Sequence, residues 1–368
     1  MPEALDVSSL EVAKPHTVKK FEFIEKYVES WIHKLLQLKT CNGIIFIDCM
    51  CNSGIYQDID GKLQYGTPIR VAKLIAKEMG RPDYLRKQAW IYLNDLEESK
   101  IDTLKEYLPK ERSNCHIVTS HGDGNELLKN IGRQLRNNNK LSYLLVYDPY
   151  QANLDWHAIA PFLNYWGEVI INHMLFDSVR AVAQVKDAEK IGKYEHTYLT
   201  SIDELVKAEC RREDYEKRIE EIITELHSIK RQYYIASCPF FNRKNALVYN
   251  LIHCTSNIEG FKLFKKTAWQ TFEGKSSGKQ KRNDGQMVMD FENGGVRMPS
   301  IDDCYTIYDI ASYLHKTFKG QGEIPLDMMW ASLDLHPIYP SDLQRNDIKK
   351  ILKESYGDKV STKTVTFI

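Results

Sequence analysis

Short runs of β-branched and aromatic residues alternate with longer amphipathic segments through the first half of this chain. The runs have the length and composition of buried strands, and the longer segments repeat their apolar residues with the period of a helix. The predicted strands are residues 44–48, 90–95, 115–119, 141–147 and 168–172. The predicted helices are residues 18–38, 69–79, 97–107, 125–136 and about 155–163. Five repeats of strand, turn and helix predict an α/β fold with a doubly wound, Rossmann-like parallel sheet.

The alternation stops at residues 180–230, which are helical in pattern and rich in Glu, Lys and Arg. We interpret them as a helical insertion, either a solvated helix pair or an arm that docks a partner. Strands resume at residues 232–237 and 246–255, and residues 238–243 are predicted to join them. Such a pair closes the sheet as an antiparallel hairpin, which is the usual ending of the sheets of S-adenosylmethionine methyltransferases.

The C-terminal part of the chain follows a different pattern. The polar, basic stretch from Gly274 to Asn283 is typical of a linker, which we extend to residue 300. Helices are predicted at residues 305–318, 326–333 and 341–355, and a short β hairpin over residues 356–368. The sequence therefore predicts a methyltransferase-like Rossmann domain over residues 1–273 and a winged-helix-like domain over residues 301–368.

Acidic residues stand at or just beyond the ends of four successive predicted strands. They are Asp48, Asp95, Asp123 and Asp148. Because the carboxyl ends of parallel strands meet at one edge of a sheet, these side chains should line one crevice. The turn after the first strand reads IDCMCNSGIY, which is closer to the acidic turn of S-adenosylmethionine enzymes than to the GxGxxG of dinucleotide enzymes. The candidate cofactor-binding residues are Asp48, Met50, Asn52, Gly54, Asp95 and Asp123.

The positions of these residues predict their roles toward S-adenosylmethionine. Asp48 and Gly54 would face the methionine end of the cofactor. Asp95 would accept hydrogen bonds from the ribose hydroxyls, and Asp123 would lie beside the adenine amine.

The candidate catalytic residues are Asp148, Pro149 and Tyr150, which follow the fourth strand. They are similar to the Asp-Pro-Pro-aromatic turn of amino-group methyltransferases. In that turn the acid and a backbone carbonyl accept hydrogen bonds from the substrate amine, and the ring stacks on a flipped base. The alternative interpretation is a proline-initiated turn without a chemical role.

The chain has 368 residues and a net charge of zero, so no overall field attracts it to nucleic acid. Nucleic-acid binding would depend on local basic stretches, which are otherwise solvated surface. The candidates are Lys275, Lys279, Lys281 and Arg282 in the linker, and Arg345, Lys349 and Lys350 on the third C-terminal helix.

The N-terminus lacks the basic and apolar parts of a signal peptide, and no apolar run approaches the roughly 20 residues of a membrane helix. We therefore expect a cytoplasmic protein. Of the eight cysteines only Cys49 and Cys51 are close together, without a partner pair at zinc spacing. Reduced thiols and no metal site are expected.

Seven stretches, in order, resemble the three-Cys-motif partner protein family (TcmP) from about residue 14 to the end. They are KPHTVKKFEFIEKYVESWI, IIFIDCMCNSGIY, YGTPIRVAKLI, HGDGNELL, YDPYQANLDW, VIINHMLFDSVR and ALVYNLIHCTSNIEGFKLFKK. The resemblance implies a methyltransferase-like Rossmann domain followed by a winged-helix-like segment. It also implies a nucleic-acid setting and a partner, a three-Cys-motif protein that looks like a radical S-adenosylmethionine enzyme.

The chain departs from the family pattern at two turns. Family members usually read Asp-x-Phe-Ala-Gly-x-Gly, where this chain has Asn52 in the turn, and Gln151 replaces the glycine that usually follows Asp-Pro-Tyr. Two hypotheses follow. One is S-adenosylmethionine-dependent methylation of an amino group of a nucleic acid. The other is a non-catalytic, nucleic-acid-binding partner with a degenerate methyltransferase fold, and a nuclease or small-molecule enzyme remains a third use of the same fold.

Overall fold

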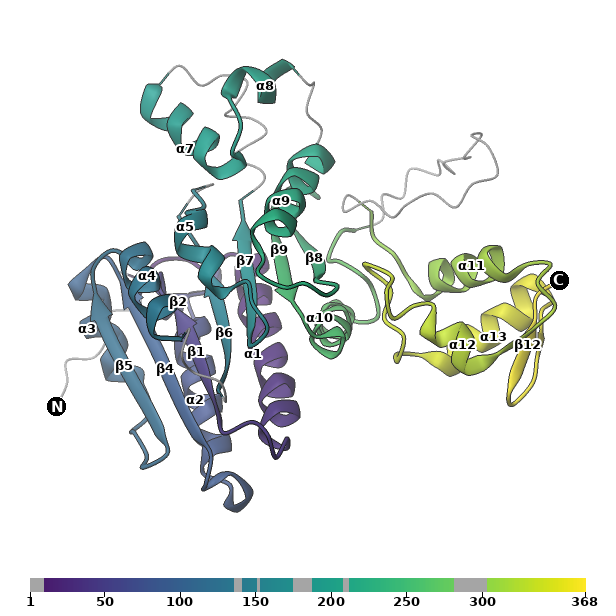
Figure 1. Cartoon of the computed structure of the whole chain (residues 1–368), viewed down its shortest axis with the longest axis horizontal. Coiled ribbons are helices and arrows are strands. Elements are labelled where there is room, and N and C mark those ends of the chain that lie inside the picture. The colour runs from purple at the N-terminus through teal and green to yellow at the C-terminus, as the bar shows by residue number, and fades with distance from the viewer. Residues whose placement is uncertain (1–9, 136–140, 151–152, 175–186, 208–211, 281–302) are drawn as a thin grey trace.

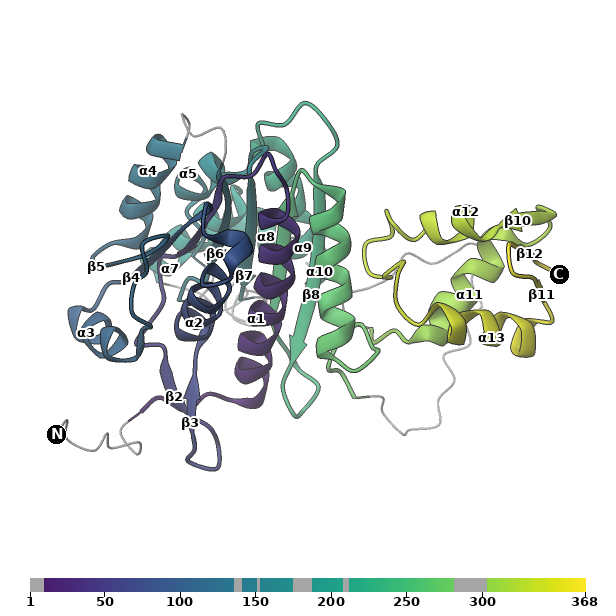
Figure 2. The same cartoon turned by 90° about the horizontal axis from the view of Figure 1, so that it is seen from below.

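The computed structural model describes residues 10–135, 141–150, 153–174, 187–207, 212–280 and 303–368. Its main body is a seven-stranded sheet with helices on both faces, and a smaller module lies beside it (Figures 1 and 2). Among the described residues, no helix is both long and apolar enough to span a membrane. The seven cysteines in the described part of the chain are unpaired thiols, and all except Cys304 are buried.

The strand order identifies the fold. The strands are β1 (Gly43–Asp48), β4 (Gln88–Asp95), β5 (Cys115–His121), β6 (Leu141–Tyr147), β7 (Gly167–His173), β8 (Tyr234–Phe241) and β9 (Leu247–Thr255). Their order across the sheet is β5-β4-β1-β6-β7-β9-β8, and β9 runs antiparallel to both of its neighbours. A parallel Rossmann sheet that ends in such a reversed hairpin is of the methyltransferase type, which confirms the predicted fold class.

Helices cover both faces of this sheet (Figures 1 and 2). One face carries α1 (Pro15–Leu36), α2 (Thr67–Met79), α3 (Glu98–Tyr107) and α10 (Ile258–Thr271), and the other carries α4 (Gly124–Leu135), α5 (Trp156–Ile159), η3 (Ala160–Phe162) and α9 (Arg212–Leu226). Strand β1 is buried on both sides, since Ile44 and Phe46 pack on the first layer and Ile45 and Ile47 on the second. A strand buried on both faces reads as a continuous apolar run, which is why the sequence predicted it.

The hairpins differ from the prediction. Strand β8 continues through Pro239 to Phe241, so the turn lies at residues 242–246 and the predicted link over residues 238–243 is wrong. Proline is tolerated here because β8 is an edge strand. A second hairpin, β2 (Ile55–Gln57) with β3 (Leu63–Tyr65), occupies a segment predicted as loop.

The helical insertion contains α7 (Ala188–Tyr198), α8 (Ile202–Lys207) and α9. It is not a solvated helix pair, because Tyr198, Ile219, Ile222 and Ile223 are completely buried in the main core. The three isoleucines stand at positions i, i+3 and i+4 of the helix and form a core-facing stripe within a charged sequence. The insertion is therefore an integral part of the main body.

The C-terminal module combines three helices with a small sheet. Its elements are α11 (Ile307–Phe318), β10 (Glu323–Pro325), α12 (Leu326–Ala331), α13 (Arg345–Tyr356), β11 (Lys359–Val360) and β12 (Thr364–Thr366). The strands form an antiparallel sheet in the order β10-β12-β11. The three predicted helices and the terminal hairpin are present, whereas the three-residue strand β10 was not predicted.

Helix α10 holds this module against the main body. The ammonium of Lys265, 2% exposed, donates to the backbone carbonyls of Leu333, Asp334 and His336 at 3.0, 2.9 and 2.6 Å. The indole N–H of Trp269 donates to the carbonyl of Ile338 at 3.0 Å. An ammonium has three donors, and all three are satisfied by the backbone of the module.

Candidate active site

The loops that follow β1, β4 and β5 lie together at the carboxyl edge of the sheet. Asn94, the penultimate residue of β4, donates to the carbonyls of Cys49 at 3.1 Å and Gly122 at 2.9 Å. A Cβ at Gly124 would meet the carbonyl oxygen of Cys49 at 2.5 Å, so the loops after β5 and β1 are in contact. The fold thus brings the acids of three loops to one edge, and Asn94, which the sequence analysis missed, joins these loops.

Asp48 is the most buried of the strand-end acids, at 3% exposure. Its Oδ1 accepts a long hydrogen bond, 3.4 Å, from the amide of Met50, and it forms no ion pair within the described part of the chain. Burial, followed by the nearby carboxylate of Asp148, raises the pKa of Asp48 to about 8. The carboxyl group is thus mostly protonated at neutral pH, and a cationic group beside it would favour the charged form.

Asp95 supports the turn after β1. Its Oδ2 accepts a hydrogen bond from the amide of Asn52 at 2.8 Å, and its Oδ1 accepts one from the amide of Glu97 at 3.1 Å. Asn52 has a φ of 55°, a left-handed conformation that asparagine tolerates better than most residues. The turn therefore keeps a glycine-like backbone although Asn52 stands where the TcmP pattern, which the sequence resembles, has a glycine. The side-chain amide of Asn52 lies 3.3 Å from the carboxylate of Glu11.

Asp123 and Gly54 have structural roles at this edge. Asp123 is exposed and accepts hydrogen bonds at 2.8 and 3.1 Å from two amides in the first turn of α4, so it caps that helix. A Cβ at Gly54, whose φ is 68°, would meet the side chains of Leu104 and Ile69 at 2.9 to 3.0 Å. Packing of the protein itself thus requires this glycine. The cofactor contacts predicted for both residues stay predictions.

Asp148 is held by two side chains that the sequence analysis did not identify. Lys20 on α1 donates to its Oδ2 at 2.5 Å, and the side-chain amide of Asn172, the penultimate residue of β7, donates to its Oδ1 at 2.5 Å. Lys20 is 7% exposed and Asn172 is 3% exposed. The ammonium also lies 5.1 Å from the ring centroid of Tyr249. Asp148 is therefore fixed from two sides, by α1 and by β7.

One signal in the sequence points to Lys20. It lies in register with Ile24, Tyr27 and Trp31 along the apolar stripe of α1, where a solvated lysine would not be expected. A lysine on a buried stripe requires a partner, because an ammonium is almost never buried alone. The partner itself could not be predicted, since 128 residues separate Lys20 from Asp148.

The two residues after Asp148 have different surroundings. Pro149 is buried, whereas Tyr150 is 89% exposed. Gln151, the second departure from the family pattern, lies outside the described residues. An exposed ring next to a fixed carboxylate is available for stacking on a planar group.

The basic candidates fall into two groups. Lys275 is exposed, and Lys279 lies 5.3 Å from the ring centroid of Phe241, while Lys281 and Arg282 lie outside the described residues. On α13, Lys350 is exposed and Lys349 partly so, and the guanidinium of Arg345 lies 5.1 Å from the ring centroid of Trp330. A Cβ at Gly274 would lie 3.2 Å from the side chain of Gln344, so the chain before Lys275 passes beside the start of α13. The segment that carries Lys275 therefore passes close to the start of the helix that carries the second group.

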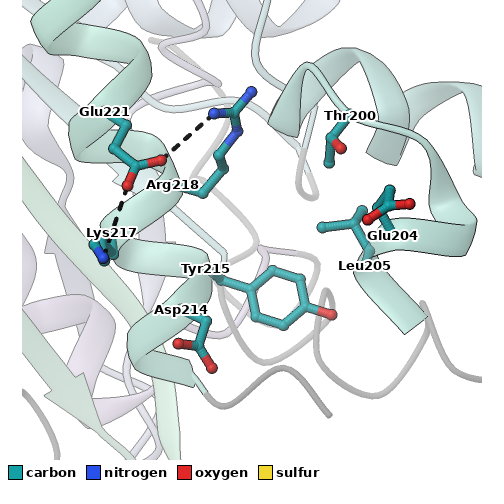
Figure 3. A pocket seen from close by; sticks show the side chains of 8 residues that line it. All are labelled: Thr200, Glu204, Leu205, Asp214, Tyr215, Lys217, Arg218 and Glu221. Carbon is teal, nitrogen blue, oxygen red and sulfur yellow. Dashed lines mark hydrogen bonds and ion pairs between the residues drawn. The ribbon is translucent and has the colours of Figure 1, made fainter. Parts of the chain in front are cut away.

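A cavity of about 350 Å³ lies in the helical insertion, between α8 and α9 (Figure 3). Arg218 and Lys217 on α9 pair with Glu221 at 3.4 and 3.9 Å. Arg218 also donates to the carbonyls of Tyr198 and Leu199 at 2.9 and 3.1 Å. These charged groups stabilise the insertion, and none of the strand-end acids lines the cavity.

No protein-family model matches this chain, and no curated protein matches it. A Legionella pneumophila protein of the DUF519 family shares 12% identity, covering 71% of this chain and 93% of its own, with a TM-score of 0.41. A Bacillus cereus O-methyltransferase in complex with SAH shares 11%, covering 63% and 80%, with a TM-score of 0.33. Human methyltransferase-like protein 13 in complex with SAH shares 8%, covering 74% and 97%, with a TM-score of 0.34. The TcmP resemblance stays a prediction, and the strand order alone places this chain among methyltransferase-type Rossmann folds.

Proposed function

We propose that this protein binds S-adenosylmethionine at the carboxyl edge of its sheet and methylates an amino group of a nucleic acid. The observation that carries the proposal is the fixed carboxylate of Asp148, which Lys20 and Asn172 hold by hydrogen bonds. Asp148 directly follows β6, and β6 pairs with β1, the strand that ends at buried Asp48. Strands β1 and β6 flank the point at which the strand order reverses. Open α/β sheets bind their ligands at this point.

The residues at this edge fit the cofactor. Asp48 is a buried acid without an ion pair among the described residues, and it suits the ammonium group of the methionine part. The carboxylate of Asp95 has about four lone-pair sites, and the two amides it binds leave room for ribose hydroxyls. When bound, S-adenosylmethionine would supply an electrophilic methyl group.

Asp148 would orient the methyl acceptor. Its oxygens can accept a further hydrogen bond from an amino group, which would direct the nitrogen lone pair. Lys20 and Asn172 restrict rotation of the carboxylate, so this direction is set before the acceptor arrives. The exposed ring of Tyr150 would stack on the base that carries the amino group.

We also propose that the C-terminal module is a winged-helix-like domain that contacts the nucleic acid backbone. Exposed or partly exposed lysines run along α13 and the terminal hairpin, and none forms an ion pair in the described structure. They are Lys349, Lys350, Lys353, Lys359 and Lys363. Each phosphate that such a side chain neutralises adds about 0.9 to the negative slope of log affinity against log salt. Replacing Lys349 and Lys350 by Ala should flatten this slope for mixed-sequence DNA. An unchanged slope would show that these two lysines of α13 do not contact the DNA phosphates.

A second candidate function is a non-catalytic partner of a three-Cys-motif protein. Two observations favour it. Asp95 already binds the backbone of the turn at Asn52, and Lys20 already occupies the carboxylate of Asp148. Co-expression with a three-Cys-motif protein would test this function, since a stable complex that survives Asp148→Ala, without methyl transfer, would support it.

Calorimetry with S-adenosylmethionine tests the proposed function directly. We expect micromolar binding by the wild-type protein, weakened at least about tenfold by Asp48→Ala, which removes the proposed ammonium partner. Asp102→Ala, which removes an exposed acid on α3 that pairs with Lys105, is the matched control. A folded protein that does not bind at high micromolar concentration would refute the cofactor proposal. Binding of the cofactor without methyl transfer to mixed-sequence DNA or RNA would favour the second function.

A further inference from the structure

We infer that the last turn of α7 is a clamp that positions the acceptor site, with Thr197 and Tyr198 as its positioning residues. The clamp joins the loop after β6 to the end of β7, the two segments that carry Asp148 and Asn172. That Asp148 and Asn172 form an acceptor site rests on the function proposed above. The contacts of the clamp with these two segments can be tested independently of that function.

Thr197 holds the loop after β6. Its Oγ1 accepts a hydrogen bond from the amide of Leu154 at 3.1 Å, and its carbonyl accepts one from the indole N–H of Trp156 at 2.8 Å. Thr197 is completely buried, and Leu154 and Trp156 are 1% and 3% exposed. This contact therefore anchors the chain a few residues beyond Asp148, in a region that water does not reach.

Tyr198 holds the end of β7. Its hydroxyl lies 2.8 Å from Nε2 of His173, and Nδ1 of His173 lies 2.7 Å from a carboxylate oxygen of Glu216 on α9. The other oxygen of Glu216 accepts a hydrogen bond from the side-chain amide of Asn250 on β9 at 2.6 Å. His173, Tyr198 and Asn250 are completely buried. Both nitrogens of the imidazole and both oxygens of the carboxylate are thus in use.

The end of β7 transmits this constraint to the acceptor site. Neighbouring residues of a strand point to opposite faces, so His173 turns toward the helical insertion while Asn172 turns toward Asp148. Fixing the imidazole therefore fixes the backbone from which Asn172 reaches the carboxylate. Any other arrangement of the imidazole and the Glu216 carboxylate would break hydrogen bonds that these two buried groups make here, which favours the observed one.

One helical turn thus positions two strand ends at once. Residues 197 and 198 are adjacent in the chain, and each contacts one of the two segments that form the acceptor site. A shift of about 1 Å in a reacting geometry can lower a rate about 100-fold. The helical insertion, whose charged sequence suggested a solvated or partner-docking arm, instead serves the geometry of Asp148.

Two conservative variants test the clamp. Thr197→Val and Tyr198→Phe remove the two side-chain oxygens of the clamp with little change in volume and leave the carbonyl of Thr197 in place. Tyr27→Phe is the matched control, because the hydroxyl of this completely buried tyrosine also contacts a histidine and a glutamate, His253 and Glu168, at the opposite end of β7. Amide hydrogen exchange is measured in peptides that cover residues 153–163, together with the affinity for S-adenosylmethionine and methyl transfer to mixed-sequence DNA and RNA.

We expect exchange in residues 153–163 to rise about fivefold or more in both clamp variants and to stay at the wild-type level in the control. Methyl transfer should fall about tenfold in the clamp variants, at an affinity for the cofactor within about threefold of wild type. Unchanged exchange in both clamp variants, or an equal rise in the control, would overturn the clamp. Failure of the wild-type protein to bind the cofactor would overturn the proposed function alone, because the exchange data decide the clamp independently.

Discussion

Two buried clusters with the same composition lie at opposite ends of β7, and they join different parts of the molecule. The amino-end cluster is Tyr27, Glu168 and His253, and the carboxyl-end cluster is Tyr198, His173 and Glu216. The first connects α1 to the sheet within the main core. The second connects the helical insertion to the strand end that holds Asp148. The same three residue types therefore support the fold in one place and the proposed acceptor site in the other.

The two clusters also differ in how completely their buried polar atoms are hydrogen-bonded. In the amino-end cluster, Nδ1 of His253 is buried and has no hydrogen-bond partner among the described residues, and the ring stacks on Phe264 with centroids 4.8 Å apart. In the carboxyl-end cluster every polar atom of His173 and of the Glu216 carboxylate is paired, and the side-chain oxygen of Asn250 beside it, outside the cluster, has no hydrogen-bond partner in the described part of the chain. A fully paired cluster defines position more sharply than a partly paired one. The two clusters thus differ in where they lie and in how many of their polar atoms are paired, and not in residue type.

The largest expected difference is in stability. His173→Ala removes a partner of the buried carboxylate of Glu216 and should lower the free energy of unfolding by about 3–5 kcal/mol. His253→Ala should lower it by about 1–3 kcal/mol, because Glu168 keeps the hydroxyl of Tyr27 as a donor. Urea denaturation of both variants measures the difference. Equal losses would show that the two clusters are energetically equivalent.

The next effect is on catalysis. Asn172→Ala removes the amide that holds Asp148 and should lower methyl transfer about 100-fold at an unchanged affinity for S-adenosylmethionine. Asn164→Ala, which removes a hydrogen bond to the carbonyl of Pro161 ahead of β7, is the control and should keep wild-type transfer. Equal methyl transfer by the two variants would show that the carboxyl-end cluster has no effect on catalysis through Asn172.

A smaller effect concerns pH. Burial, followed by the carboxylate of Glu216, raises the pKa of Glu220 on α9 to about 7. A carboxyl group whose pKa is raised on folding stabilises the folded state fully below its ordinary pKa, 4.5 here, and this contribution is lost as the pH rises through about 7. Amide protection of α9 should fall by about 1 kcal/mol between pH 6 and 8, and Glu220→Gln should flatten this change.

Comparison with Glu220→Gln at each pH is needed because Asp48 titrates in the same direction. The pKa of Asp48 is raised to about 8, so overall stability also falls as the pH approaches that value. The amide protection of α1, which contributes Tyr27 to the amino-end cluster, serves as the internal reference. If the substitution changed α1 and α9 alike, the titration would belong to the whole fold and not to the carboxyl-end cluster.

The smallest effect is expected on the surface of the insertion. Lys193 and Glu189 form an i,i+4 ion pair at 2.8 Å on α7, with side chains 40% and 78% exposed. Lys193→Ala should lower stability by only about 0.3 kcal/mol and leave exchange in residues 153–163 unchanged. Loss of protection in that segment would mean that any weakening of α7 reaches the acceptor site, without a specific contribution from Thr197 and Tyr198.

The alternating fold could be predicted from the sequence because each strand and helix is a local pattern. The continuous apolar run from Ile44 to Ile47 predicted a strand buried on both faces, and it is one. The end of β8 was misplaced because residues 238–243, which include Pro239, were predicted as the link to the next strand, whereas an edge strand accepts a proline. The insertion was misjudged because its charged residues outnumber the few apolar positions that face the core.

The acceptor site could be predicted only in part. Asp148 follows a recognisable strand and lies in a recognisable turn, so a local pattern identified it. Its partners Lys20 and Asn172 come from 128 residues before it and 24 residues after it, and only the folded sheet brings the three together. Long-range pairs of polar side chains leave no periodic signal in a single sequence.

The lysine on α10 has a consequence for how this chain can be divided or recombined. A truncation at residue 273 would strip the three carbonyl acceptors from Lys265, on a helix whose other side belongs to the core of the main body. The apolar surface of α10 that the module covers would be exposed, which would make the shortened chain prone to aggregate. We therefore expect the two parts to unfold together in a single transition. A functional exchange of the C-terminal module between homologues would have to include α10, which places the recombination boundary before residue 258 and not in the linker.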